Sequence, residues 1–227
     1  MVAASDSGID AGAIQPMGLE KILRVVAIAQ ENRLPFLHLV ESAGANLLKY
    51  RVEDFIHGGG LFCGMTRLSA AGIPVVTVVH GSSTAGGAYM PGMSDYVVMV
   101  RGRAKAFLAG TALLKAATGE DASEEELGGA EMHATVSGLA EYLAEDDADG
   151  IRLAREVLAK LDWNRDLRRE QKSVAAPRRD IEELLGLVPL DTKKPYDVRE
   201  VIARLVDGSD FLDFKRGYGV STVCGHA

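Results

Sequence analysis

The chain has 227 residues, of which 47% are hydrophobic and 25% are charged, a composition typical of a soluble globular protein. Its formal net charge of −7 and its pI of about 5.3 argue against a general nucleic-acid binder. No apolar run approaches the ~20 residues of a membrane-spanning helix, and the N-terminus lacks the basic-then-apolar order of a secretory signal, so neither a nucleic acid nor a membrane is expected as a partner.

The two cysteines, Cys63 and Cys224, stand far apart, and neither belongs to a Cys-x-x-Cys pair. Such thiols are typical of a reducing compartment, so a cytoplasmic location is expected, or the mitochondrial matrix in a eukaryote. No group of His, Cys, Asp and Glu residues has ligand spacing, so no metal site is expected.

Strand and helix patterns alternate along the first ~160 residues, which predicts an α/β layered domain. Residues 2–5 are expected to form a short strand, and an amphipathic helix is expected from Leu19 to a point before Pro35. A buried strand is predicted at Phe36–Val40, followed by a loop of small residues.

A second helix is predicted to start within Gly60–Met65 and to end at Ala71, closed by Gly72. The next buried strand is predicted at Val75–Val79, which is β-branched throughout. The glycine-containing stretch His80–Asp95 follows it directly.

This stretch is the strongest candidate for a functional site. Gly86 and Gly87 have no Cβ, so the backbone can approach a ligand there, and a short helix is predicted at Gly86–Met93. The first amide N–H groups of a helix lack intrahelical partners and can hold an oxyanion that forms during a reaction. A glycine turn after a strand gives the same pattern, so the glycines by themselves do not decide.

Beyond this stretch the pattern predicts further short elements. Ser123 and Glu126 have the spacing of a capping box, and Asp146 or Asp147 is expected to cap a helix that runs to Leu161. Short strands and a helix are predicted at Tyr96–Val100, Lys105–Leu108 and Leu113–Ala117.

Residues 162–180 are rich in Arg and Lys and poor in apolar residues, which predicts an exposed basic linker. Two short helices are expected within Ile181–Leu190 and Val198–Val206. A strand is expected at Tyr218–Cys224 with no partner after it, so the chain is expected to oligomerise or to bind a partner.

Taken together, the motifs resemble those of the carboxyltransferase (beta) subunits of biotin-dependent acyl-CoA carboxylases, in the crotonase superfamily. The nearest branch is the methylcrotonyl-, geranyl- or general acyl-CoA type. The similarity covers nearly the whole chain, in the family's order. The stretches that carry it are Asn32–Pro35, Leu39–Ser42, Ala71–Pro74, Gly81–Asp95, Lys115–Glu120, Leu127–Ala130, His133, Ser137–Gly138, Ala144–Asp147, Tyr196–Arg204 and Asp207–Ser209.

The resemblance implies a crotonase-like (ClpP/crotonase) layered fold, in a family that carries two such domains in tandem. On this basis residues 1–161 are the first carboxyltransferase domain, incomplete at its start, and 162–180 the linker. Residues 181–227 are then connector helices and the opening strand of a second, truncated domain. The chain is therefore expected to be a fragment or a truncated relative.

The implied reaction moves a carboxyl group from carboxybiotin, carried on a partner protein, to an acyl-CoA. The resemblance implies a biotin carboxylase/biotin carboxyl carrier subunit as partner. It also implies that the chain forms a homo-oligomer or binds a complementing carboxyltransferase half. Backbone amides hold the oxyanions, and by analogy Gly86 and Gly87 form the hole for the thioester oxygen. The local sequence agrees, because between Gly81 and Met93 only Tyr89 can ionise, and it is a poor base at neutral pH.

The resemblance also implies an acyl-CoA and biotin pocket. Its residues are Ser42, Ala43, Gly44, Ala45, Thr84, Ala85, Ala88, Tyr89, Gly110 and Thr111. Two loops depart from the family pattern. Ala43 stands where the family has the first of two glycines, and Ala109–Ala112 replaces Gly-Gly-Pro-Pro, which puts substrate choice or activity in question.

Two alternatives remain open at this point. One is a non-catalytic truncated subunit that acts in assembly or regulation of a carboxylase complex. The other is a Clp-like serine hydrolase, with Ser82 or Ser83 as nucleophile, His133 as base and Asp146 or Asp95 as its orienting partner.

Overall fold

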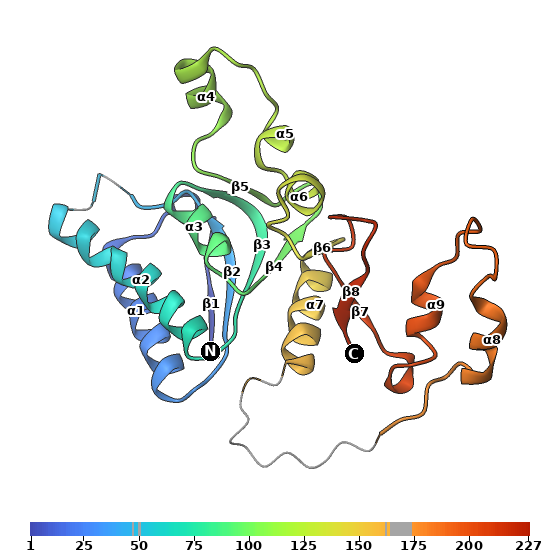
Figure 1. Ribbon diagram of the computed structural model, residues 1–227. Helices are drawn as coiled ribbons and strands as arrows, with labels where there is room; N and C mark the ends of the chain where they lie inside the picture. The colour runs from blue at the N-terminus through green and yellow to red at the C-terminus, as the bar shows by residue number, and fades with distance from the viewer. Residues whose placement is uncertain (47, 50, 162, 164–173) are drawn as a thin grey trace. The chain divides into compact units, whose positions relative to one another are not determined.

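The computed structural model describes residues 1–46, 48–49, 51–161, 163 and 174–227 (Figure 1). They belong to two compact units, Met1–Asn164 and Arg165–Ala227. Most of the expected basic linker, residues 162 and 164–173, lies outside the described residues. None of the helices in the described part of the chain has the length and apolar character needed to cross a membrane.

The first unit alternates strands and helices as the sequence predicts. In chain order its elements are β1 (Val2–Ala4), η1 (Asp10–Gly12), α1 (Pro16–Glu31), β2 (Phe36–Ser42), α2 (Val52–Ala70), β3 (Val75–Thr84), α3 (Gly86–Gly92), β4 (Tyr96–Val100), β5 (Lys105–Phe107), α4 (Thr111–Thr118), α5 (Glu124–Gly128), α6 (Ala130–Met132), η2 (His133–Ser137), β6 (Tyr142–Ala144) and α7 (Asp147–Lys160).

A parallel sheet forms the centre of this unit, with the order β1-β2-β3-β4-β6. β5 pairs with β3 off this path, because β3 is long enough to pair with two strands in succession. Its residues Val76–Val79 pair with β4, and its residues Ser82–Thr84 pair with β5. The prediction that this strand ends at Val79 is therefore wrong, since backbone pairing with β5 extends it through residues that favour turns.

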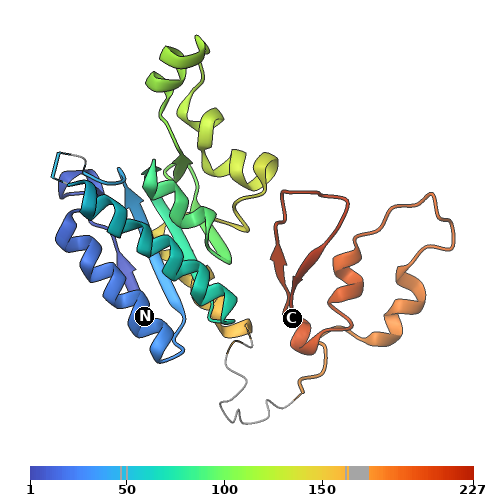
Figure 2. The same ribbon diagram turned by 60° about the vertical axis from the view of Figure 1, so that its left-hand side comes forward.

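Helices cover the two faces of the sheet. α1 and α2 lie side by side on one face (Figure 2), where the residues of the main core cluster pack around Phe36, Val40 and Val75. α7 contacts β3, β4 and β6. Its Gly150 lies against Val78, which points to the opposite face from Val75, so α7 covers the other side of the sheet.

The start of α2 is a second correction. The sequence analysis places the start within Gly60–Met65, yet the helix begins at Val52 and runs through Gly58, Gly59 and Gly60. Two glycines of α2, Gly58 and Gly64, let α1 approach closely. A Cβ on Gly64 would lie 2.7 Å from Val26 Cγ1, and one on Gly58 would lie 3.3 Å from Leu19 Cδ2. Packing against α1 at these two positions therefore offsets the ~1 kcal/mol that a helical glycine costs.

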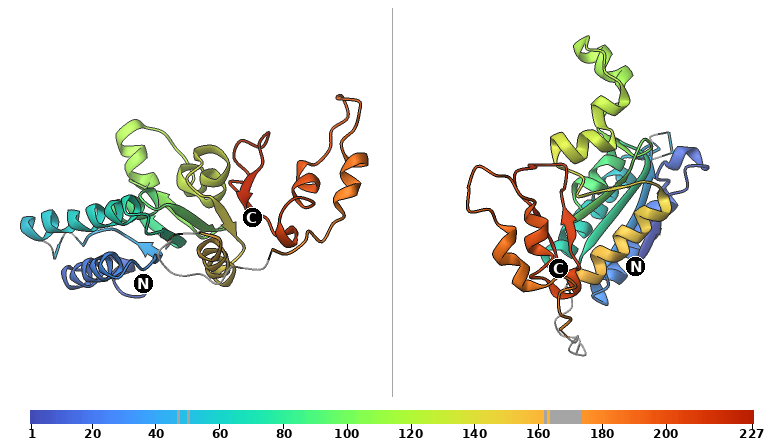
Figure 3. Two further views of the ribbon diagram at one scale, coloured as in Figure 1. Left: turned by 60° about the horizontal axis from the view of Figure 1, so that its bottom comes forward. Right: turned by 90° about the vertical axis from the view of Figure 1, so that its right-hand side faces the viewer.

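The second unit contains η3 (Ile181–Glu183), α8 (Leu184–Leu187), α9 (Val198–Ile202), η4 (Asp207–Ser209), β7 (Leu212–Phe214) and β8 (Cys224–His226). The expectation of an unpaired terminal strand is wrong, because β8 pairs antiparallel with β7 (Figure 3). The turn before Cys224 returns the chain to an earlier strand. The argument for oligomerisation from a lone strand edge therefore does not hold.

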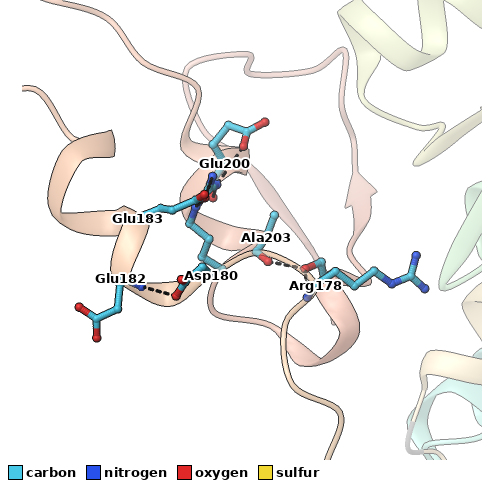
Figure 4. A network of polar contacts seen from close by, with 8 residues as sticks. Arg178, Asp180, Glu182, Glu183, Glu200 and Ala203 are labelled. Carbon is cyan, nitrogen blue, oxygen red and sulfur yellow. Dashed lines mark hydrogen bonds and ion pairs between the residues drawn. The ribbon is translucent and has the colours of Figure 1, made fainter.

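Polar contacts hold this unit together. Among its described residues only Arg204 is buried, at 7% exposure, and no apolar side chain is. The Arg204 guanidinium donates to Glu183 Oε2 at 2.5 and 3.0 Å and to Glu200 Oε2 at 2.9 Å. Ser209 Oγ extends the network by donating to the Ala203 carbonyl and accepting from the Arg178 amide (Figure 4).

Candidate functional site

The candidate site lies where β2 and β3 end. The two strands are parallel neighbours, so their carboxyl ends lie at the same edge of the sheet. A short loop, residues 43–46, follows β2, and α3 follows β3 after one residue. The sequence prediction that a helix begins at the glycine pair is confirmed.

A sharp backbone turn at Ala85 makes this start possible. Ala85 has φ 50° and ψ −121°, a conformation that alanine rarely adopts. Its amide donates to the Phe107 carbonyl at 3.2 Å, which ties the turn to the end of β5. Unusual backbone angles at a non-glycine residue are frequent at functional sites.

The amides of Gly86 and Gly87 follow the turn. Among the described residues neither N–H has a hydrogen-bond partner, as expected for the first turn of a helix. The two glycines differ in their surroundings. A Cβ on Gly86 would find only Phe62 Cζ at 4.0 Å, whereas one on Gly87 would lie 2.7 Å from the Ser42 carbonyl oxygen. Gly87 therefore allows α3 to pack directly on the end of β2.

The loop after β2 lies beside these amides. Gly44 has φ +83°, and a Cβ there would lie 3.4 Å from the Gly86 nitrogen and 3.2 Å from the Thr84 carbonyl oxygen. Glycine is required at this position for both reasons. Ala43 is exposed, and its amide donates to the Ala11 carbonyl at 3.1 Å, so the substituted loop still has an ordered hydrogen bond.

The other predicted pocket residues lie at different depths. Ser42 is fully buried behind the loop, while Ala45, Thr84 and Ala88 are half-buried. Tyr89 is 46% exposed and packs edge-on against Phe62 of α2, with the ring centroids 5.5 Å apart.

An apolar groove of about 480 Å³ lies on the neighbouring loop. Gly110 and Thr111 stand at its edge, where the chain leaves β5 and enters α4. Phe107 joins the groove to the turn at Ala85 through the hydrogen bond described above. The lining residues are Ala106, Phe107, Leu108, Ala109, Leu113, Leu114, Ala117 and Leu127.

Thr111 stands where the family pattern Gly-Gly-Pro-Pro has its first proline, and this difference leads to a prediction. Thr111 is the first residue of α4, its amide has no partner among the described residues, and Gly110 before it is extended at φ −72° and ψ 171°. Proline fits such a position, so Thr111→Pro is expected to stabilise α4 locally by about 0.4–1 kcal/mol. Native-state hydrogen exchange of the α4 amides measures this, with Ala116→Pro as the destabilising control. Faster exchange in Thr111→Pro would contradict the prediction.

No hydrogen bond among the described residues joins His133 to a serine or an aspartate of the hydrolase alternative. Both ring nitrogens of His133 are already engaged, Nδ1 with Ser137 Oγ and Nε2 with the Ala106 carbonyl, each at 2.7 Å. Asp146 caps α7 through the Asp149 amide, and Asp95 accepts from the Val75 amide. Ser83 is fully buried, so it cannot meet a substrate, and the exposed Ser82 has no hydrogen bond to His133 among the described residues.

A different histidine has an acidic neighbour. Glu41 Oε2 lies 3.7 Å from His80 Nδ1, where the register between β2 and β3 shifts. The side chain of Glu41 occupies the space where a Cβ on Gly81 would be, which explains the glycine there. The pair lies beside the glycine turn, and no further polar contact of His80 joins it to α3 among the described residues.

Sequence reasoning missed three contributors to the site. Gly12 supports the loop after β2, Phe62 supports Tyr89, and Phe107 holds the turn at Ala85. Of the three, only Gly12 has a residue type that marks it in the sequence, because glycine is common in turns and loops. The other two belong to elements distant in sequence, and their contacts arise from the sheet pairing and the extended α2.

Comparison with known proteins matches residues 1–227 to the Carboxyl transferase domain family. A Mycobacterium tuberculosis protein named "Probable biotin-dependent acyl-coenzyme A carboxylase beta2 subunit" is 54% identical over 227 residues, which are 100% of this chain and 42% of the relative. The chain thus spans less than half the length of this relative.

Solved structures agree. The geranyl-CoA carboxylase beta subunit of P. aeruginosa is 59% identical with a TM-score of 0.67, over 99% of this chain and 42% of that one. The transcarboxylase 12S hexamer, solved with methylmalonyl-coenzyme A bound, is 33% identical with a TM-score of 0.86, over 99% and 43%. Because the family match extends over every residue of the chain, this protein belongs to the carboxyl transferase domain family, with the crotonase-like fold of its solved relatives.

Proposed function

We propose that the chain is the first half of the carboxyltransferase component of a biotin-dependent acyl-CoA carboxylase. It transfers a carboxyl group to an acyl-CoA, in a reducing cytoplasmic compartment or the mitochondrial matrix. The observation that carries the proposal is the pair of amides at Gly86 and Gly87, which have no hydrogen-bond partner among the described residues and lie at the sheet edge between the Gly44 loop and the turn at Ala85.

The residues present fit an acyl-CoA. In the reaction, negative charge develops on the thioester oxygen when the α or γ carbon of the acyl group loses its proton. The two amides donate to that oxygen, and each such donor contributes about 3 kcal/mol of transition-state stabilisation. Gly86 leaves the approach open because, in the described part of the chain, only Phe62 lies within 4 Å of the position that its Cβ would take. Carboxybiotin, delivered on its carrier partner, supplies the carboxyl group.

This chain is proposed to position the acyl-CoA and to stabilise the negative charge on its thioester oxygen. Between Gly81 and Met93 the only ionisable side chain is Tyr89, so no protein base is assigned in this segment. Ala43, Gly44, Ala45, Thr84, Ala85 and Ala88 shape the floor around the amides. Tyr89, braced by Phe62, forms an exposed wall beside them.

The apolar groove is proposed to take the acyl group. Its lining is aliphatic and aromatic. Phe107, one of the lining residues, accepts a hydrogen bond from the Ala85 amide through its carbonyl, which places the groove beside the turn at Ala85. One solved relative is named as a geranyl-CoA carboxylase, and a geranyl group is an apolar chain of the kind that such a groove would bind. Gly110 and Thr111 lie at its edge.

The groove can be tested by adding charge to it. Leu114→Asp is expected to raise KM about tenfold for acyl-CoAs with long apolar chains, because the chain loses apolar contact and meets a carboxylate. Acetyl-CoA should be affected less. Ala116→Asp places the same charge on α4 outside the groove and is the control. Equal effects of the two variants would argue against the groove as acyl site.

The proposed activity is tested by transfer of radiolabelled carboxyl from a carboxybiotin-loaded partner to several acyl-CoAs. The 227-residue chain is assayed alone and with the complementing half, the part of the relatives that this chain does not span. Transfer is expected only in the completed assembly, since the second oxyanion hole, proposed to serve biotin, is supplied by that half. Transfer by the chain alone would refute the two-half arrangement. No transfer in the completed, folded assembly would favour a non-catalytic subunit.

A further inference from the structure

The side chain of Ser42, the last residue of β2, joins segments that meet at the site without reaching its surface. It is 0% exposed, so it cannot touch a substrate. We propose that Ser42 is a positioning residue for carboxyl transfer, which fixes the Gly44 loop and the amides of α3 relative to one another. This inference rests on the proposed function.

The hydroxyl of Ser42 uses both of its hydrogen-bonding capacities. It donates to the Gly12 carbonyl at 2.9 Å and accepts from the Gly44 amide at 3.1 Å. Both glycines have positive φ, +70° and +83°. Backbone in this region keeps one conformation only where its surroundings impose it, and the hydroxyl supplies that restraint.

The loop that contains Gly12 and the loop that contains Gly44 are also joined through their backbones. The Ile14 amide donates to the Gly44 carbonyl at 2.8 Å, and the Ala43 amide donates to the Ala11 carbonyl at 3.1 Å. These two bonds join main chain to main chain, and the Ser42 hydroxyl adds a side-chain link between the same loops. A loss of this hydroxyl therefore loosens the Gly44 loop at the point where it faces Gly86.

The backbone of Ser42 positions the other partner. A Cβ on Gly87 would lie 2.7 Å from the Ser42 carbonyl oxygen and 3.1 Å from the Ser42 Cβ, so the first turn of α3 rests on this residue. Ser42 thus contacts both sides of the proposed oxyanion site. A displacement of well below 1 Å in either side would misalign the amides with the thioester oxygen.

Ser83 offers a matched control. It pairs directly opposite Ser42 in the sheet, and it is also 0% exposed. Its hydroxyl has no hydrogen-bond partner among the described residues. Removing the Ser83 hydroxyl therefore deletes a buried polar group at the same depth without breaking a bond, which is expected to be neutral or stabilising.

The first experiment tests the geometry and needs no activity. Amide exchange of the 227-residue chain is measured by NMR in wild type, Ser42→Ala and Ser83→Ala. In Ser42→Ala the Gly44 amide should exchange about five to tenfold faster, and the Gly86 and Gly87 resonances should shift. Ser83→Ala should change neither. Unchanged Gly44 exchange in a folded Ser42→Ala would overturn the proposal.

The second experiment uses the completed carboxylase, with rates normalised to folded protein. Ser42→Ala should lower kcat about tenfold and change KM for acyl-CoA less than twofold, because the misaligned amides act on the transition state. Ser83→Ala should keep wild-type kcat, and an equal loss in it would overturn the proposal. If Ser42→Ala does not fold, Ser42→Cys, with its weak S–H donor, should show the same changes in smaller degree, and wild-type values in it would count against the proposal.

The two experiments separate the inference from the function beneath it. Faster Gly44 exchange with an inactive wild-type assembly would overturn the proposed function and the catalytic role of Ser42, while the positioning of the loop would stand. Normal exchange with normal catalysis in Ser42→Ala would overturn the positioning role alone.

Discussion

Gly87→Ala is expected to reduce carboxyl transfer by the completed assembly about a hundredfold or more. The added Cβ would lie 2.7 Å from the Ser42 carbonyl oxygen, closer than real contacts allow, and 3.1 Å from the Ser42 Cβ, so α3 must move away from β2. Moving the helix takes the Gly86 and Gly87 amides out of line with the thioester oxygen, and one lost donor alone accounts for an effect of this size. The loss should appear in kcat more than in KM.

Gly92→Ala is the control for this prediction. Gly92 ends the same helix, and no described residue lies within 4 Å of the position that its Cβ would take. An alanine there should leave turnover intact. Retention of full activity in Gly87→Ala, or an equal loss in Gly92→Ala, would contradict the assignment of the amides at the start of α3.

Acidification is expected to destabilise the first unit through His38. This residue of β2 is fully buried, its ring lies 5.4 Å from that of Phe36, and neither ring nitrogen has a partner in the described structure. Burial lowers the pKa of His38 from its ordinary value of 6.5 to about 4. Between those values the unfolded chain binds a proton that the folded protein does not, so the free energy of unfolding falls as pH falls. The loss between pH 7 and pH 4 is about 3 kcal/mol.

His38→Leu should remove this term, since leucine has no proton to bind. Urea unfolding of the wild type and the variant at pH 7 and pH 4.5 measures the difference between them, which should grow in favour of the variant as pH falls. His57→Gln is the control, because His57 is exposed beside Glu20. A constant difference between His38→Leu and wild type across this range would show that His38 is not the source.

Local sequence was sufficient wherever one element decides its own structure. The apolar runs that begin at Phe36 and Val75 form strands. Their residue types favour a buried strand, and this preference does not depend on which strand they pair with. Ser123 and Glu126 form the predicted capping box, and Asp146 caps α7, because each cap involves residues three apart in one turn. The glycine pair likewise places the start of α3.

Pairings between distant segments could not be predicted in this way. β3 continues to Thr84 only because Lys105–Phe107 pairs with its end, and β8 has a partner only because the chain folds back to Leu212–Phe214. β6 was missed because three residues, Tyr142–Ala144, are too few to show a period. α2 begins at Val52 because its glycines pack against α1, a contact between two helices.

The sequence by itself determined the family, the alternation of strand and helix, and the glycine pair at the candidate site. These features depend on residue types. A missing Cβ or a β-branched side chain changes the conformations that its own residue can adopt, whatever the surroundings. Only the tertiary structure decided what surrounds that pair. Ser42 is a small polar residue that the sequence analysis assigns to the pocket. It is instead buried, and its hydroxyl both donates and accepts a hydrogen bond. The reason is that Gly12, Gly44 and Gly87 converge on it from three separate segments. Convergence of that kind depends on how the segments cross, and no single stretch of sequence contains it.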